Sequence, residues 1–99
     1  MSEHPARIIE KFDPEFIKLV ENISEFILSE GALSKKIKLL IAMALDASHR
    51  AVGGVKALAR EAMEAGATKE EIMEALRVAQ LVSGVGSIYS VAQALKELF

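Results

Sequence analysis

The stretch that decides the fold is residues 33–72, LSKKIKLLIAMALDASHRAVGGVKALAREAMEAGATKEEI. It contains an uninterrupted apolar run over residues 39–45, which is typical of a helix buried on most of its sides. A polar joint at residues 46–50 and a pair of glycines at 53–54 separate this helix from a second one. The pattern predicts two helices at the centre of a bundle or of an oligomer.

The end of this stretch predicts a further helix boundary. Gly66 is expected to end the second of these helices. Thr68 and Glu71 then form a capping box, in which the threonine side chain accepts a backbone N–H while the glutamate reaches back to the cap residue. We therefore expect a helix that starts just after Thr68.

The segment before the central stretch predicts a long amphipathic helix. Residues 13–15, Asp-Pro-Glu, combine a capping side chain, a proline suited to the first helical turn and an acid near the positive end of the helix dipole. Apolar residues then recur at helical spacing at Phe16, Val20, Ile23 and Ile27. We expect this helix to end near Glu30.

The segment after it predicts one more helix, which starts from Ser87 behind a glycine-containing break. No strand-period segment or internal repeat accompanies these helices. The expected fold class is all-α, a bundle of about five or six helices joined by short loops. We expect a single domain over residues 1–99, of which residues 1–8 form a flexible tail.

The composition predicts self-association. Fifty-two per cent of the residues are hydrophobic and the mean hydropathy is +0.29, which is high for a chain of 99 residues. A small domain buries only a modest fraction of its surface, so part of this apolar surface is expected to meet another subunit. The expected partner is the protein itself, as a homo-trimer or homo-hexamer.

Several other partners are not expected. The formal net charge is −2, with acids and bases well mixed, which gives no electrostatic footprint for nucleic acid. The longest apolar run, residues 39–45, is far shorter than the roughly 20 residues that span a bilayer. The polar start of the chain lacks a signal-peptide layout, so we expect a soluble cytoplasmic protein.

The absence of cysteine limits the chemistry. These 99 residues contain none, which excludes disulfides, thiolate nucleophiles and cysteine-ligated metals within them. No second histidine lies near His49 in the sequence, so we expect no metal site. The glycines do not follow a strand, so we expect no nucleotide cofactor either.

Residues 33–72 resemble the carboxymuconolactone decarboxylase and alkylhydroperoxidase (AhpD-like) family. The resemblance lies in the Leu-Ser-Lys-Lys opening at residues 33–36, the apolar helix behind it, and the run Ala-Met-Glu-Ala-Gly-Ala-Thr-Lys-Glu-Glu-Ile at residues 62–72. The glycine-bearing joint at residues 84–86 is similar too, so the likeness covers roughly the last two-thirds of the chain. It implies an all-helical subunit that assembles into trimers or hexamers, with a cleft near the interfaces.

The redox branch of that family carries a motif that this chain lacks. The motif is a glutamate, eleven residues, a cysteine, two residues, a second cysteine, three residues and a histidine. Counted back from the shared glycine, these positions fall at Leu39, Ala51, Gly54 and Leu58. The decarboxylase pattern, an acid four residues before a histidine, fails at Gly54 and Leu58 as well. In an alternative register, His49 is the motif histidine, but no cysteine precedes it.

The polar residues that remain near this region are Asp46, Ser48, His49 and Arg50. If the helix continues through them, Asp46 lies three residues before His49 and four before Arg50, on neighbouring parts of one face. A carboxylate that orients an imidazole, beside a guanidinium that binds an anion, is suited to acid–base chemistry. Alternatively, the same residues form a helix-end network in which Asp46 pairs with Arg50.

Two functional hypotheses follow. The first is an AhpD-like helical oligomer that has lost the thiol site and has a binding or structural role. The second is an enzyme that uses Asp46, His49 and Arg50 on a small anionic or lactone-like substrate. The sequence does not decide whether the protein is an enzyme, because the family's catalytic residues are absent from it.

Overall fold

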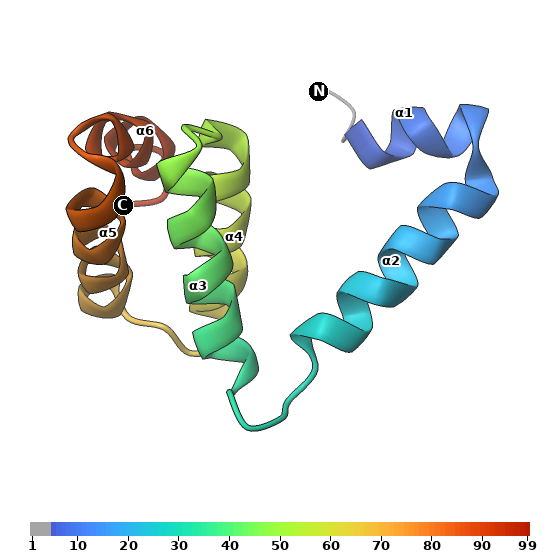
Figure 1. The fold of residues 1–99 in the computed structure, drawn as a ribbon, viewed down its shortest axis with the longest axis horizontal. Helices are drawn as coiled ribbons and strands as arrows, with labels where there is room; N and C mark the ends of the chain where they lie inside the picture. Colours follow the sequence, from blue (N-terminus) through green and yellow to red (C-terminus); the bar gives the residue numbers. More distant parts are fainter. Residues whose placement is uncertain (1–4) are drawn as a thin grey trace.

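The computed structural model describes residues 5–99, which form six α-helices and no β-strand. The helices are α1 (Pro5–Phe12), α2 (Pro14–Leu28), α3 (Lys35–Ser48), α4 (Val52–Glu64), α5 (Lys69–Ser83) and α6 (Gly86–Leu95). The expected all-α class and the number of helices are confirmed. Figure 1 shows that α3–α6 gather into one bundle, while α1 and α2 extend away from it.

Capping side chains define where three of the helices begin, and two of them, Asp13 and Thr68, are predicted from the sequence. Asp13 and Ser34 each accept a hydrogen bond from the backbone N–H three residues later, at 3.1 and 3.2 Å. Thr68 Oγ1 accepts the Glu71 N–H at 3.1 Å, and Glu71 Oε1 accepts the Thr68 N–H at 2.9 Å. These bonds satisfy backbone donors that a helix leaves free at its start, so the predicted capping box at α5 is confirmed.

Helix α3 lies at the centre of the bundle and contacts α4, α5 and α6. Leu39 and Met43 of α3 are fully buried, together with Val55 of α4 and Ile72 of α5. The prediction that the apolar run is buried on most sides needs correction within a single chain. Ile41 and Leu45 keep 46% and 57% of their surface exposed, because no helix of the same chain covers that face of α3.

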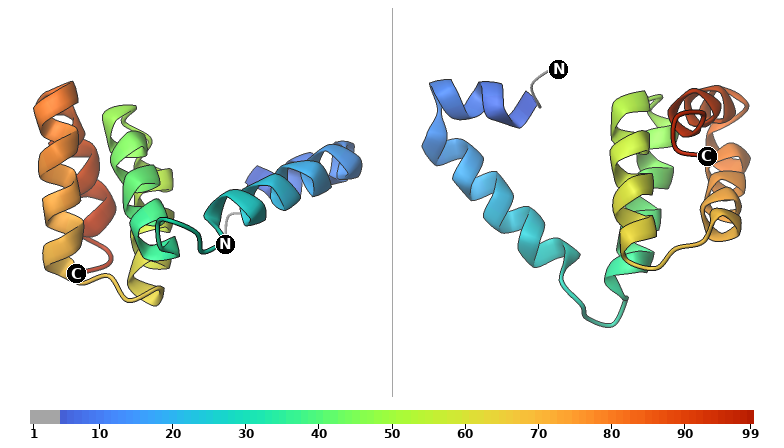
Figure 2. Two further views of the ribbon diagram at one scale, coloured as in Figure 1. Left: turned by 60° about the horizontal axis from the view of Figure 1, so that its bottom comes forward. Right: turned by 180° about the vertical axis from the view of Figure 1, so that it is seen from behind.

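Helices α1 and α2 form an arm, residues 5–28, that is joined to the bundle by residues 29–34. Figure 2 shows from two further directions that the arm diverges from α3. Helix α2 ends at Leu28, two residues before the expected end, and Leu28 packs against the core. The radius of gyration is 14.1 Å, larger than the roughly 13 Å of a compact domain of this length.

Residues 5–8 of the expected tail belong to helix α1, and the flexibility of this segment stays a prediction. A proline fits the first turn of a helix, because its missing N–H has no partner there in any case. An ion pair of 2.6 Å between Arg7 and Glu10, one turn apart, further supports this helix. Residues 1–4, the rest of the expected tail, lie outside the described residues.

No described helix is both long and apolar enough to span a bilayer.

Candidate functional site

The polar joint forms the turn between α3 and α4. His49 is the C-terminal cap of α3, and its N–H donates to the carbonyls of Leu45 and Asp46, both at 3.1 Å. Arg50 follows with φ +59°, in the left-handed region that side chains other than glycine seldom adopt. The Ala51 N–H donates to the Asp46 carbonyl at 2.9 Å and closes the turn. Such a closing bond satisfies the free carbonyls at a helix end.

The side chain of Asp46 faces the first turn of α4. It is half-buried, and a methyl group built on Gly54 would overlap its carboxylate. The family resemblance places the second motif cysteine at Gly54. In this chain, the space that the cysteine side chain would enter is therefore occupied by a carboxylate.

Arg50 connects the joint to a third helix. Its exposed guanidinium lies directly over Gly86, the first residue of α6, where a methyl group would collide with it. No carboxylate in the described part of the chain forms an ion pair with Arg50. A cation without an acidic partner, close to the backbone N–H groups at a helix start, produces a local positive potential.

The side chains of Asp46, His49 and Arg50 do not contact one another through any hydrogen bond or ion pair within residues 5–99. His49 projects from the surface as an exposed side chain. Ser48 donates its hydroxyl to the Leu45 carbonyl at 2.6 Å, which leaves it directed at its own helix. The alternative network, with Asp46 paired to Arg50, is thus not formed in this chain.

The structure shows the surroundings of the four positions at which the family resemblance places its glutamate–cysteine–histidine motif. Leu39 is fully buried, Leu58 is half-buried against the core, and Ala51 is the N-terminal cap of α4 without a side-chain bond. A glutamate at position 39 would need to be desolvated in this core, which is costly for an unpaired carboxylate. No group of three His, Asp or Glu side chains suited to a metal occurs in the part of the chain that the structure describes.

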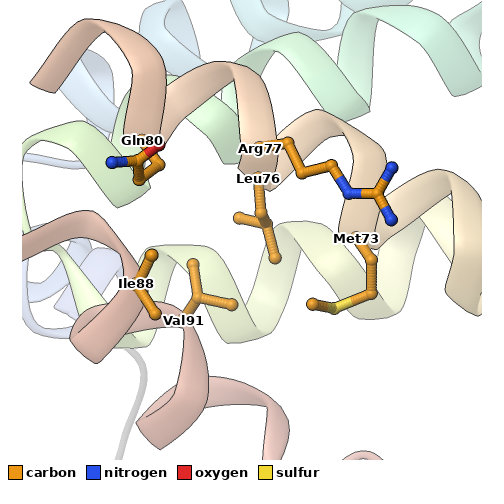
Figure 3. A pocket seen from close by; sticks show the side chains of 6 residues that line it. All are labelled: Met73, Leu76, Arg77, Gln80, Ile88 and Val91. Atoms are coloured by element: carbon orange, nitrogen blue, oxygen red, sulfur yellow. The ribbon is translucent and has the colours of Figure 1, made fainter. Parts of the chain in front are cut away.

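A small apolar pocket, which is not predicted from the sequence, lies between α5 and α6. Its walls are Met73, Leu76, Arg77, Gln80, Ile88 and Val91. In Figure 3, Leu76 of α5 points toward Val91 of α6, and the polar ends of Arg77 and Gln80 lie at the rim. Its volume of about 180 Å³ is below the roughly 300 Å³ at which small-molecule sites begin, and better suited to an inserted side chain.

Two carboxyl groups have shifted pKa values, and both take part in tertiary contacts. The hydrogen bond from Lys36 of α3, at 2.8 Å, lowers the pKa of Glu71 at the start of α5 below its ordinary value. In the same way, the hydrogen bond from Lys56 of α4 lowers the pKa of Glu97 near the end of the chain. The first ion pair joins α3 to α5, the second joins α4 to the turn after α6, and both lie outside the joint.

The described residues form an all-helical fold with a polar joint between α3 and α4, and the sequence contains no cysteine. A sequence profile of the carboxymuconolactone decarboxylase family matches residues 14–97, and the chain belongs to this family. An uncharacterized protein of Methanocaldococcus jannaschii is 29% identical over 91 residues, which cover 92% of this chain and 85% of that protein. No solved structure matches the chain significantly. The matched residues include all of α2, whereas α1 lies before them.

Proposed function

We propose that this protein is a thiol-free member of the carboxymuconolactone decarboxylase family that functions as a homo-trimer or homo-hexamer, in a binding or structural role. Thiol-based peroxide reduction is excluded for these residues by the absence of cysteine. The large and apolar surface of the single chain supports this proposal.

The accessible area is the single observation that carries the proposal. The chain exposes 6903 Å², whereas a compact monomer of its mass, 10.7 kDa, exposes only about 5,500 Å². The excess of about 1,400 Å² exceeds the roughly 800 Å² that each partner buries in a typical specific interface. An oligomer removes this excess from water.

The exposed apolar side chains support the same conclusion. They gather in three places: along the arm, along the uncovered face of α3, and around the end of α5 and the start of α6. In the last of these, Leu81 and Val82 are 80% and 81% exposed, with Val85 and Tyr89 beside them. Separate apolar surfaces favour an assembly with more than one kind of contact, as a hexamer built from trimers requires.

Size-exclusion chromatography with multi-angle light scattering on the full chain tests this proposal. We expect a particle of three or six times the 10.7 kDa subunit mass at micromolar concentration. A stable particle of 10.7 kDa would contradict the proposal.

A second candidate function is acid–base chemistry at Asp46, His49 and Arg50 on a small anionic or lactone-like substrate. One observation favours it: the Asp46 carboxylate occupies the space next to Gly54 where the family resemblance places a reactive cysteine. Arg50 has no acidic partner among the described residues, which leaves it available to an anion.

Calorimetric titration with a five-membered lactone that bears a carboxylate tests this candidate. We expect binding that weakens at least tenfold in Arg50→Ala, and turnover that is lost in His49→Ala and in Asp46→Asn. Wild-type levels of binding and turnover in the His49→Ala protein would remove the candidate. Arg77→Ala is the matched control, since it removes an exposed guanidinium from α5 without touching the joint.

A further inference from the structure

We infer that the arm of one copy lies in the groove between α3 and α5 of a neighbouring copy. This inference rests on the proposed homo-oligomer and specifies which surfaces meet. The groove is an apolar hollow between two helices of the bundle, and the arm contains the amphipathic helix α2, whose apolar face is exposed.

The apolar face of α2 is continuous and exposed. With about 100° of rotation per residue, its large apolar side chains fall within an arc of roughly 120°. These side chains are 40–79% exposed. They are Phe16, Leu19, Val20, Ile23, Phe26 and Ile27. The charged residues Lys18, Glu21 and Glu25 occupy the opposite side, as in a helix that docks by one face.

The linker holds the arm away from the bundle of its own chain. The Lys38 ammonium donates to the Ile27 carbonyl at 2.8 Å and to the Ser29 carbonyl at 2.7 Å, which attaches the end of α2 to α3. Glu30 Oε1 accepts the backbone N–H of Lys35 at 3.3 Å. To fold back onto the groove of its own chain, the arm would have to break these bonds. Binding to the groove of a second copy leaves these bonds intact.

The groove suits an apolar helix. It is lined entirely by aliphatic side chains: Ile37, Leu40, Ile41, Ala44, Ala75 and Val78. The two alanines are small and leave room for a large side chain from a partner. Because no charged or polar side chain lines the groove, it offers nothing to a polar ligand, whereas the arm supplies a complementary apolar stripe.

The lengths and areas also agree. The exposed stripe of α3 from Ile37 to Leu45 is roughly 12 Å long, and the stripe of α2 from Phe16 to Ile27 is roughly 16 Å long, at about 1.5 Å per residue. Each subunit gives one arm and receives one, so every copy buries both an arm and a groove. Two contacts per subunit therefore bury more of the excess accessible area, about 1,400 Å², than a single flat patch does.

Site-specific cross-linking tests the inference, because the chain contains no cysteine that would compete. Ile23→Cys lies in the middle of the arm stripe and Ile41→Cys in the middle of the groove. The two full-length single variants are co-expressed with different tags, purified through both tags and treated with a short bismaleimide. We expect a covalent heterodimer as the main product, and none from either variant alone. Lys18→Cys, on the polar side of α2, replaces Ile23→Cys in the control pair and should give at least tenfold less product.

The outcomes separate this inference from the proposed function. Light scattering is performed on each variant before cross-linking. An oligomer in which Ile23→Cys links only to itself, or in which the control pair links equally well, overturns the arm-to-groove contact and leaves the oligomer standing. A monomer overturns both. Recovery of the Ile23→Cys chain in a covalent complex with a different protein also overturns the inference.

Discussion

Two adjacent glycines at the start of α4 have different surroundings although the sequence does not distinguish them. Nothing lies within 4 Å of a methyl group built on Gly53, whereas one built on Gly54 overlaps the Asp46 carboxylate. Both residues lie in the helix, so both carry the entropic cost of glycine, but only one is required by a close approach.

We therefore expect Gly53→Ala to raise the free energy of unfolding by about 0.5–1 kcal/mol, the helix propensity gain of alanine over glycine. Gly54→Ala should give no such gain, because the Asp46 side chain has to move. In the Asp46→Ala background, Gly54→Ala should gain the same amount as Gly53→Ala. Urea denaturation at one fixed protein concentration measures the free energy of unfolding of the four proteins of this double-mutant cycle, which are the wild type, Gly54→Ala, Asp46→Ala and the double variant. The Gly53→Ala protein is measured beside them. Equal effects of Gly54→Ala in both backgrounds would contradict the close approach.

At the scale of the element, polar contacts between helices fix the relative positions of the helices, which apolar packing alone does not fix. The Lys36–Glu71 ion pair joins the first turns of α3 and α5, and Lys38 joins α3 to the end of α2. Both lysines belong to the group of cations at the start of α3, which is an unfavourable place for positive charge unless it finds a partner. The structure provides that partner in each case.

The ion pair predicts a pH dependence. The pKa of Glu71 in the folded chain is lowered from 4.5 by Lys36 and by the Thr68 backbone, so the ionised form stabilises the fold. A lowered pKa contributes stability that is complete above 4.5 and is lost as the pH falls through the folded-state value. We expect Glu71→Gln to destabilise the protein at pH 7 and to have a smaller effect near pH 3, measured by urea denaturation. Glu70→Gln, in the same turn but without an ion pair, is the control.

Lys38, near the start of α3, predicts a local effect on the linker. Lys38→Met should lower the free energy of unfolding by about 1 kcal/mol, because two carbonyls at the end of α2 lose their donor. Amide hydrogen exchange should become faster across residues 27–34. Lys35→Met is the matched control, since the Lys35 side chain is exposed and makes no such bonds. Unchanged exchange in the Lys38→Met protein would show that the linker is held by something else.

At the scale of the whole molecule, the arm and the bundle differ in how well they are packed. The bundle of α3–α6 has its own buried core, but the arm holds only one buried apolar side chain, Ile17, among its described residues. A helix of this length is marginal in water without tertiary packing. In the proposed oligomer, association with another copy stabilises the arm as well as joining the subunits.

A charged residue in the apolar face of α2 tests the proposed contact between the arm and another copy. Ile23→Asp places a carboxylate in the proposed contact, and we expect the subunit to become monomeric by light scattering. Burial of an unpaired charge costs several kcal/mol, and about 4 kcal/mol corresponds to a thousandfold weaker association. Asn22→Asp adds the same charge outside the stripe and should leave the assembly intact. Dissociation in both variants would indicate a general charge effect rather than this contact.

Most of the fold could be predicted because its signals are local. The caps at Asp13 and Thr68 lie where the sequence predicts them, since a cap depends on a residue and its own next turn. The end of α2 and the helical state of residues 5–8 were not predicted, because weak boundaries depend on contacts beyond the turn. The joint residues remain a prediction as a site, although their positions are now described.

The sequence by itself determined the helical class, the family resemblance and the loss of thiol chemistry, because these depend on residue identity and spacing along the chain. Only the tertiary structure decided where the side chains meet. It placed the Asp46 carboxylate against Gly54, left His49 exposed, and directed the apolar stripe of α2 away from its own bundle. The physical reason is that periodicity shows which face of a helix is apolar, whereas the surface that covers this face depends on contacts between residues far apart in the chain.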